Sequence, residues 1–518
     1  MNCKSDQALD YHEATKHSEL SIRVSGHLLD WGNRPTPFKV YKNLKAIPLP
    51  RDFSLPSEGS LKAISGIHPK AEGRGVDLHT LAQLLFFSAG LTRVAKFNSG
   101  PYYMRAAPAT GALYPIELYV VCGDISGLKA GVYHFNALGF SLVQLRDGDH
   151  TGELGAMSDD SVLTAPVTVV LTSLAWRNAW KYGARSYRHW FWDSGVMTAN
   201  LLATGVSVGL KCGLIMGFVD SEVDRLLCLS ERKETTIVLA PVGLGPAGSH
   251  PKEMRQLSRL SPEVNLLSSE EVEYPVIWRT HEASSITSRD EVKTWVQSRP
   301  TFPESLAVGN KIPLRSAKDS VQAPSLGEVI LRRGSARRFD RLPISFEQLS
   351  TIIDASTSAI PLDFLKPGEM LVDIYLTAND VKGLQSGAYF YNRRAGCLEE
   401  LKAGQFRRIS GYLCLEQPLF SDASAVFYLM TNLNSVIGAL GNRGYGAAQF
   451  EAGVIAGKVY LSAYSLSMGA SGSTFYDDAV TEFFSPHAKD KSTMMAVGVG
   501  IPAYKAKSGK VLPQMSVS

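Results

Sequence analysis

The feature that most constrains the fold is a long internal repeat. The segment LYVVCGDISGLKAGVYHFN begins at Leu118 and IYLTANDVKGLQSGAYFYN begins at Ile374, so the two lie 256 positions apart. Asp124 in the first segment corresponds to Asp380 in the second. Apolar residues alternate on both sides of the shared glycines, which predicts a strand, a turn and a second strand in each copy.

Further matches extend the repeat to a whole domain. YRHWFWDSGVMTANLLATGVSVG begins at Tyr187, and YGAAQFEAGVIAGKVYLSAYSLSMG begins at Tyr445. Both have apolar and small residues at helical spacing, which predicts a long buried helix. Each copy ends with an apolar strand and a glycine turn, near 235–245 and 492–502. A unit that mixes strands with long helices is α+β, and this period is too long for a solenoid.

The repeat predicts four regions in the chain. They are an N-terminal extension over residues 1–59, a first domain over 60–248, a connector over 249–324 and a second domain over 325–518. The connector is rich in Ser, Pro and charge and lacks a sustained period, although YPVIW at 274–278 is apolar enough to pack on a neighbour.

Composition excludes several classes of function. The net charge is only +4 over 518 residues, which gives no reason to expect nucleic acid or an anionic membrane as a partner. None of the six cysteines stands in a C-x-x-C pair, so we expect no metal site and mostly buried, reduced thiols. The sequence shows neither an apolar signal core nor a membrane span, and the expected location is cytoplasmic.

The first candidate site is LRRGSARRFD at 331–340. It gathers Arg332, Arg333, Arg337 and Arg338 around Gly334 and a serine, Ser335. Forked guanidinium donors, a hydroxyl and backbone N–H groups suit a phosphate monoester. The alternative is a solvated basic helix end.

Two stretches of small residues are candidates for close approach to a flat ligand. Pro108, Ala109, Thr110 and Gly111 precede a predicted strand, and SMGASGSTFYDD at 467–478 is a Gly/Ser-rich loop. The first is also explained by an ordinary strand-entry turn, and the second by a helix stop.

An adjacent lysine and tyrosine, Lys181 and Tyr182, precede the first long helix within WKYGARSYRHW. They would serve as acid and base groups if burial or a neighbouring cation lowered either pKa. A polar helix terminus with amphipathic side chains is the alternative.

Together these motifs resemble the nitroreductase superfamily, and within it the SagB-type dehydrogenases that oxidise thiazole-containing peptides. The resemblance covers nearly the whole chain. It is carried by YHEATKHSELSIR near the N-terminus, the GALYP loop, the KYGARSYR segment and RRGSARRF, which is similar to the superfamily's RRSxR motif with Gly334 inserted.

The resemblance implies FMN at an interface between two subunits. One subunit supplies the arginines and the Gly-rich loop, and the other supplies the loop that begins with proline. Here the first copy has Pro108–Gly111 but LKAISGIHPKAEGRG in place of the arginines, whereas the second has the arginines but STSAIPLDFLKPGEM in place of the loop. We therefore expect an intrachain pseudo-dimer with one complete FMN site and one decayed site.

The resemblance also implies the composition of that site. Arg332, Arg333, Ser335 and Arg337 would bind the phosphate, together with Lys505 or Lys507. Pro108, Ala109, Thr110 and Gly111 would lie against the flavin from the other half. The stretch Gly469, Ala470, Ser471 and Gly472 would lie near the redox edge of the flavin.

The implied chemistry removes a proton and a hydride from an azoline ring, with Lys181 as general base and Tyr182 as relay or orienting donor. Oxygen would reoxidise the flavin. Two other hypotheses stay open: a nitro- or quinone reductase that uses NAD(P)H, and a non-catalytic flavoprotein or scaffold in a peptide-modifying complex. The sequence is also compatible with further association of the pseudo-dimer.

Overall fold

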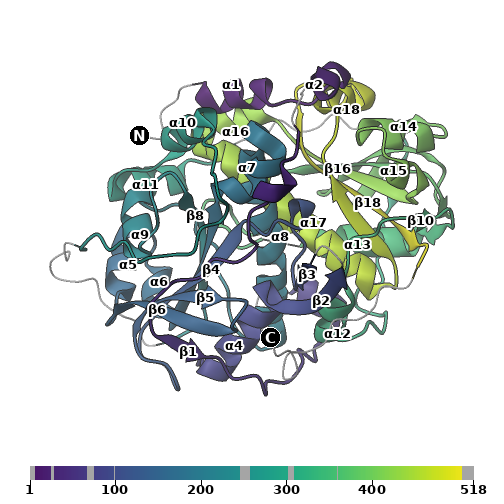
Figure 1. The fold of residues 1–518 in the computed structure, drawn as a ribbon. Helices are drawn as coiled ribbons and strands as arrows, with labels where there is room; N and C mark the ends of the chain where they lie inside the picture. The colour runs from purple at the N-terminus through teal and green to yellow at the C-terminus, as the bar shows by residue number, and fades with distance from the viewer. Residues whose placement is uncertain are drawn as a thin grey trace.

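The computed structural model describes residues 6–24, 28–66, 75–97, 100–245, 257–300, 309–358 and 360–504. Two antiparallel sheets stand on either side of a central pair of long helices, α8 (Ser186–Ser207) and α17 (Arg443–Ser465) (Figure 1). Nearly every residue of both helices is buried. This confirms the expected buried helices, and the fold is a mixed arrangement of helices and sheets.

The first sheet has six strands in the order β1-β6-β5-β4-β7-β8. Its strands are β1 (Ala46–Pro48), β4 (Ile116–Cys122), β5 (Gly131–Asn136), β6 (Ser141–Asp147), β7 (Val167–Leu174) and β8 (Glu234–Val242). The predicted strand–turn–strand unit is the β4–β5 pair, in which Cys122 faces Gly131.

The second sheet repeats this order as β18-β16-β12-β14-β15-β9, with β10 and β17 also paired to β18. Its strands are β9 (Lys311–Pro313), β10 (Phe339–Asp340), β12 (Asp373–Ala378), β14 (Gly387–Asn392), β15 (Cys397–Ala403), β16 (Ala425–Thr431), β17 (Gly469–Ser473) and β18 (Ser492–Pro502). β4, β5, β6, β7 and β8 therefore correspond to β12, β14, β15, β16 and β18.

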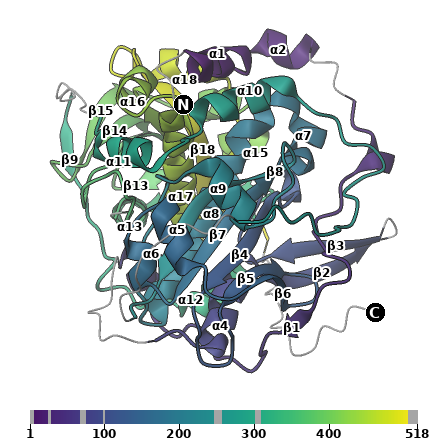
Figure 2. The same cartoon turned by 90° about the vertical axis from the view of Figure 1, so that its left-hand side faces the viewer.

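The remaining strands form two small pairs. β2 (Leu91–Phe97) and β3 (Gly100–Arg105) make a hairpin that projects from the body of the molecule (Figure 2). β11 (Ile344–Ser345) pairs in parallel with β13 (Val381–Lys382).

Shorter helices cover the sheets. In the N-terminal half they are α1 (Gln7–Ala14), α2 (Glu19–Val24), α3 (Ser60–Ser65), α4 (Leu78–Ala89), α5 (Thr151–Met157), α6 (Ser161–Thr164), α7 (Ala175–Tyr182) and α9 (Asp220–Leu226). Beyond them are α10 (Pro275–Ser284), α11 (Arg289–Gln297), α12 (Leu326–Arg332), α13 (Phe346–Ser356), α14 (Arg407–Leu413), α15 (Pro418–Asp422), α16 (Leu433–Leu440) and α18 (Asp477–Phe484). Three 3-10 turns are η1 (Trp31–Asn33), η2 (Thr110–Ala112) and η3 (Gly183–Arg185).

Glycines allow α8 and α17 to cross at very short range. A Cβ on Gly195 of α8 would lie 2.4 Å from the carbonyl oxygen of Phe450, and one on Gly453 of α17 would lie 2.6 Å from that of Trp192. Backbone atoms cannot yield as a flexible side chain can, so only glycine fits at these positions. The glycines that the repeat shares thus set the approach of the two halves.

The N-terminal segment joins the two halves. α1 lies beside α10 and above α16 in Figure 1. The backbone N–H of Ala8 donates to Asn442, that of His17 donates to Asp477 at 2.8 Å, and Arg188 of α8 donates to the carbonyl oxygen of His12 at 2.9 Å. The YHEATKHS motif therefore links the two halves through hydrogen bonds.

The region between the repeats contains more regular structure than its sequence suggests. Ile277 and Trp278 of α10 are buried, which confirms that YPVIW packs on a neighbour. α11 follows, and β9 joins the edge of the second sheet beside β15. Tertiary packing stabilises these short helices, which have little periodicity of their own in the sequence.

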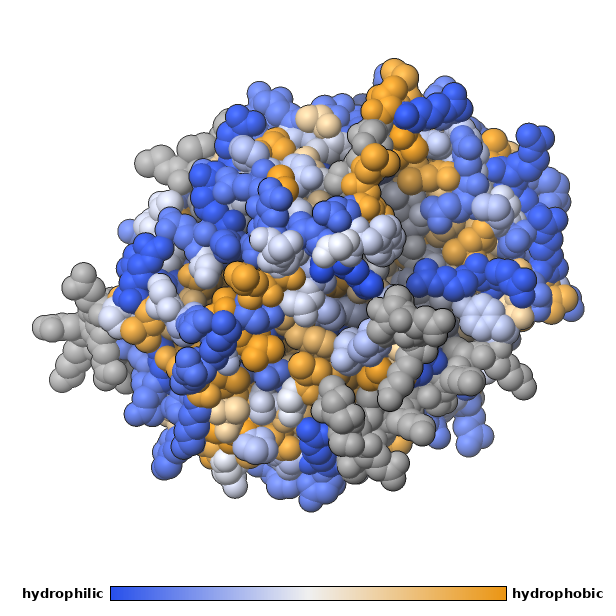
Figure 3. Space-filling view, in the orientation of Figure 1, coloured by the Kyte–Doolittle hydropathy of each residue, from blue (hydrophilic) through white to orange (hydrophobic). Residues whose placement is uncertain are grey.

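Half of the exposed large apolar side chains among the described residues lie between Leu20 and Leu55. α2 buries none of its residues, and Leu20 and Val24 are each 69% exposed. Figure 3 shows a largely hydrophilic face with an apolar projection near its upper edge, where α2 lies in Figure 1. Five cysteines of the described residues are free and buried, as expected: Cys122, Cys212, Cys228, Cys397 and Cys414.

Candidate active site

The loop that enters β4 has an unusual backbone. Gly111, Ala112 and Tyr114 all have positive φ, at 61°, 53° and 49°. Residues with a side chain rarely adopt this region, and such strain is found most often at functional sites. The loop is nevertheless held in place, because Asp193 accepts hydrogen bonds from the backbone N–H of Thr110 at 2.8 Å and from its hydroxyl at 2.7 Å.

Asp193 lies in the middle of α8, and its second oxygen accepts a hydrogen bond from Asn178 at 3.2 Å. Burial raises the pKa of Asp193 to about 6, and the bonds from Thr110 oppose this rise. Glu451 occupies the corresponding place in α17 and accepts the backbone N–H groups of Leu371 and Val372. In both halves, therefore, an acid of the central helix holds the segment that enters the sheet.

Gly111 has no side chain, and this allows the Tyr182 hydroxyl to lie close to the backbone of the loop. A Cβ on Gly111 would lie 2.7 Å from the Tyr182 hydroxyl oxygen, and Gly111 itself is exposed. The glycine therefore leaves the backbone open beside the hydroxyl, as a site for a flat ligand requires.

Lys181 and Tyr182 form the C-terminal end of α7, which stops at Gly183 with φ 53°. The Lys181 ammonium lies 5.4 Å from the centre of the Tyr182 ring, and the His189 ring packs edge-on against the Tyr182 ring with 4.5 Å between ring centres. The pKa of Lys181 is lowered by burial and by the positive charges of Arg337 and Arg34. Burial and then Asp193 raise the pKa of Tyr182, so Tyr182 keeps its proton at neutral pH.

The arginine motif of the second half reaches back to the first. Arg333 donates from Nε to the carbonyl oxygen of Ala106 at 3.1 Å and from Nη2 to that of Arg105 at 3.0 Å. Arg332 donates to the carbonyl oxygen of Tyr464 at 2.6 Å, near the end of α17. Since a guanidinium has five N–H groups, each arginine keeps donors for another acceptor.

The same segment continues along β17. The N–H of Ala336 donates to the carbonyl oxygen of Ala470 at 2.9 Å, and the N–H of Arg337 donates to the Tyr504 hydroxyl at 2.9 Å. Gly469–Ser473 is a strand, so the expectation of a loop at this place was wrong. β18 supplies a complete set of backbone partners that the local sequence does not reveal.

The structure thus brings most of the expected residues together. The proline-led loop, Lys181 and Tyr182 come from the first half, and the arginine motif comes from the second; Arg337 lies close enough to act on both Lys181 and Tyr182. Ser335 is half-buried next to them, and its carbonyl oxygen accepts from Tyr504. Lys505 and Lys507 lie outside the described residues.

The residues present fit an FMN molecule. Among described residues, no carboxylate forms an ion pair with Arg332, Arg333, Arg337 or Lys181, so the cluster has an excess of positive charge that suits a phosphate. A Cβ at Gly111 would close the approach to the loop. Gly111 and the arginines come from segments more than 200 residues apart, as an interface site requires.

Several residues of this site were not found from the sequence. The sequence showed Asp193 only as part of the repeat. Its match to Glu451 was a signal that both acids have a structural role in the central helices. Tyr460 and Tyr464 stand four positions apart on α17, and the Tyr460 hydroxyl accepts the N–H of Gly472 at 2.5 Å. Tyr504 and Arg34 carried no pattern that distinguishes them from surface residues.

Other kinds of site find no support in the part of the chain described. No group of three or more His, Cys, Asp or Glu side chains is arranged to hold a metal ion there. Within the same residues, no helix has the length and apolar character needed to cross a membrane.

Comparison with known proteins identifies the family of one domain. Residues 74–244 match the Nitroreductase family, so the chain contains a domain of this oxidoreductase family. The nitroreductase-like protein MJ1384 of Methanocaldococcus jannaschii is 29% identical over 168 residues, which cover 32% of this chain and 80% of that protein. The trifolitoxin-processing protein TfxB of Rhizobium leguminosarum bv. trifolii is 30% identical over 163 residues, covering 30% of this chain and 43% of TfxB.

One solved structure resembles nearly the whole chain. A nitroreductase-like protein from Anabaena variabilis aligns with a TM-score of 0.75 and 25% identity, and the alignment covers 96% of this chain and 99% of that one. The likeness therefore includes both sheets and the helices between them.

Proposed function

We propose that the chain is an FMN-dependent oxidoreductase built as an intrachain pseudo-dimer of two nitroreductase-like domains, and that it oxidises an azoline or related ring in a modified peptide. In this proposal the domains span 60–248 and 325–518, with an extension at 1–59 and a connector at 249–324. The matching strand orders of the two sheets and the paired glycine contacts of α8 and α17 support a tandem origin.

One observation carries the proposal: groups from opposite halves meet at one place. The positive charge of Arg337 in the second half lowers the pKa of Lys181 and opposes the rise in the pKa of Tyr182, both in the first half. Arg333 also donates a hydrogen bond to the carbonyl oxygen of Ala106, beside the loop. Neither half has both the arginines and the loop. A single composite cofactor site between the halves explains why each keeps only its own part.

The residues of the proposed site have three roles in binding FMN. Arg332, Arg333, Ser335 and Arg337 bind the phosphate, with Lys505 or Lys507 as a further candidate. Pro108, Ala109, Thr110 and Gly111 lie against the ring system, where Asp193 holds the loop in place. The β17 residues Gly469, Ala470, Ser471 and Gly472 approach the flavin from the second half.

Bound FMN would supply the acceptor for a hydride. Lys181 takes the proton that leaves the substrate ring, since its lowered pKa enlarges the fraction of neutral amine. Tyr182 stays protonated and orients the substrate by donating a hydrogen bond. The ring loses one proton and one hydride, two electrons in all, and becomes an aromatic azole; oxygen is the proposed final acceptor.

A processed peptide is the proposed substrate class on two grounds. The KYGARSYR and YHEATKHS segments resemble those of SagB-type dehydrogenases, and the relative TfxB is a trifolitoxin-processing protein. This chain spans less than half of TfxB, so the substrate is a proposal for this chain alone.

The test uses the purified full chain, a thiazoline-containing peptide and mass spectrometry. We expect loss of two hydrogen atoms from the peptide, with Lys181→Ala slower by about 10²–10⁴-fold while its flavin absorbance is unchanged. Lys293→Ala, an exposed lysine on α11, is the matched control and should behave as wild type.

Other results would redirect the assignment. A Lys181→Ala variant as fast as wild type would remove the lysine from the mechanism. Rapid bleaching of the flavin by NADH or NADPH, without peptide oxidation, would favour a nitro- or quinone reductase. A colourless protein that does not take up FMN would favour a scaffold.

A further inference from the structure

The two halves are related by a local twofold arrangement that can be read residue by residue. The N–H of Ser60 donates to the carbonyl oxygen of Pro324, and the N–H of Leu326 donates to that of Glu58, both at 2.9 Å. α3 and α12 are thus counterparts, 266 positions apart. The paired contacts of Gly195 and Gly453 relate α8 to α17 with an offset of 258.

These offsets locate the counterpart of the proposed flavin site. Gly66, which follows α3, stands in the place of Arg332, and Val206 of α8 stands in the place of Tyr464. The contact is repeated as well: a Cβ on Gly66 would lie 3.0 Å from Val206, just as Arg332 bonds to the carbonyl oxygen of Tyr464.

The strand next to the site shows the same correspondence. Cys212 pairs with Val242 of β8, as Ala470 pairs with Val499 of β18. Leu202 takes the place of Tyr460 on the neighbouring helix. The counterpart therefore has a thiol where the proposed site has the methyl group of Ala470, and aliphatic side chains where it has tyrosines.

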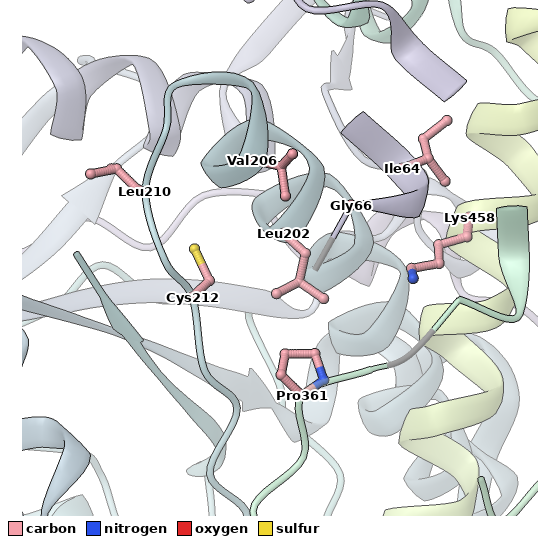
Figure 4. A pocket seen from close by; sticks show the side chains of 8 residues that line it. All are labelled: Ile64, Gly66, Leu202, Val206, Leu210, Cys212, Pro361 and Lys458. Carbon is pink, nitrogen blue, oxygen red and sulfur yellow. The ribbon is translucent and has the colours of Figure 1, made fainter. Parts of the chain in front are cut away.

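A small cavity remains at this place. It is lined by Ile64, Gly66, Leu202, Val206, Leu210, Cys212, Pro361 and Lys458 (Figure 4). Its volume of about 10 Å³ is close to the room that one water molecule needs. No flavin fits without displacement of the lining side chains.

Lys458 of α17 extends into this group of side chains (Figure 4). It is 4% exposed, and its amine donates to the carbonyl oxygen of Ser358 at 3.1 Å and to the Ser358 hydroxyl at 2.9 Å. Its counterpart in the proposed site is Asn200, which bonds to the carbonyl oxygens of Phe87 and Ala106. Ser358 belongs to the segment that replaces the proline-led loop.

We infer that this cavity is a closed counterpart of the proposed flavin site, so that each chain holds a single FMN, and that Tyr460 and Tyr464 are positioning residues of the open site. The inference rests on the proposed function. It follows from four matched replacements, in which Gly66, Leu202, Val206 and Cys212 stand for Arg332, Tyr460, Tyr464 and Ala470. Tyr460 holds β17 through the N–H of Gly472, and Leu202 has no hydroxyl with which to do so.

The experiment titrates flavin-free full chain with FMN and follows flavin fluorescence. Wild type should bind about one FMN per chain. Arg332→Gly copies the closed half and should weaken binding by about 10-fold or more, since a hydrogen bond to a charged group contributes roughly 1.5–3 kcal/mol. Tyr464→Val also copies the closed half. It keeps the carbonyl oxygen that Arg332 bonds and removes the hydroxyl beside Gly334, so it should weaken binding to a smaller extent. Lys458→Met alters only the closed half and should still bind about one FMN with wild-type affinity.

The outcomes distinguish failure of the closed-site inference from failure of the proposed function. Two FMN per wild-type chain, reduced to one by Lys458→Met, would overturn the closed site and leave the proposed function standing. Unchanged binding in both Arg332→Gly and Tyr464→Val would overturn the correspondence of the sites. Absence of FMN binding by the wild-type chain would refute the proposed function itself, and the inference with it.

Discussion

Replacing Gly453 by alanine would test the crossing that holds the two halves together. The new Cβ would lie 2.6 Å from the carbonyl oxygen of Trp192 and 3.0 Å from that of Phe191. Both neighbours are backbone atoms of a buried helix, so relief requires α8 and α17 to separate by several tenths of an ångström. Overpacking of this kind costs roughly 1–3 kcal/mol, and here we expect about 3 kcal/mol.

Gly438 of α16 provides a matched control. It also lies within a helix, but no heavy atom is within 4 Å of the position its Cβ would take. Gly438→Ala should therefore stabilise the protein by about 0.5–1 kcal/mol through helix propensity alone. The same gain applies to Gly453→Ala and is included in its expected net loss.

Urea and thermal unfolding followed by circular dichroism would measure both variants, and FMN titration would follow the proposed composite site. With an unfolding entropy of about 2 cal/mol/K per residue, a loss of about 3 kcal/mol lowers Tm by about 3–6 °C, depending on whether one half or the whole chain unfolds together. FMN affinity should fall in Gly453→Ala and not in Gly438→Ala. Equal stability of Gly453→Ala and wild type would show that the close helix crossing does not exist.

Three further changes test the site and its counterpart. Gly111→Ala places a methyl group 2.7 Å from the Tyr182 hydroxyl at a residue with φ 61°, so FMN affinity measured by titration should fall about tenfold; unchanged affinity would remove the loop from the site. Asp193 has a folded-state pKa of about 6 against an ordinary 3.8, so its contribution is fully present below pH 3.8 and is lost as pH rises through 6, up to about 3 kcal/mol. Asp193→Asn should therefore reduce the difference in unfolding free energy between pH 4 and 7, and an identical pH profile would contradict the burial argument. Burial lowers the pKa of Lys458 to about 7 from 10.5, so its charge destabilises the folded state below pH 7, and this penalty vanishes as pH rises to 10.5. Lys458→Met should therefore raise the free energy of unfolding by about 2 kcal/mol at pH 7 and by little at pH 10. A lower free energy of unfolding at pH 7 would show that the bonds to Ser358 dominate.

The hydrogen bonds of the N-terminal segment show that a motif shared with a family can serve to hold the structure together. YHEATKHS carries part of the resemblance to SagB-type dehydrogenases, and its residues accept hydrogen bonds from Arg185 and Arg188. Asp477 of the second half bonds to both arginines, at 3.0 and 2.7 Å. These arginines hold the pKa of Asp477 well below its usual range against the effect of burial. The motif therefore stabilises the junction on which the composite site depends.

The sequence by itself determined the repeated order of strands and helices, because alternation and helical spacing are local and the same pattern occurs twice. It also indicated a composite site, because the arginine motif and the proline-led loop occur in different copies. Lys181 and Tyr182 were recognised as a pair from adjacency alone.

Only the tertiary structure decided how those parts meet. The strand at Gly469–Ser473 depends on β18 for its partners, and the bond from Arg333 to the carbonyl oxygen of Ala106 joins residues 227 positions apart. The proposed closure of the second site rests on Leu202, Val206 and Cys212, which are ordinary apolar residues in any local window. Such features follow from the angle and distance at which α8 and α17 cross, and no local period in the sequence encodes that geometry.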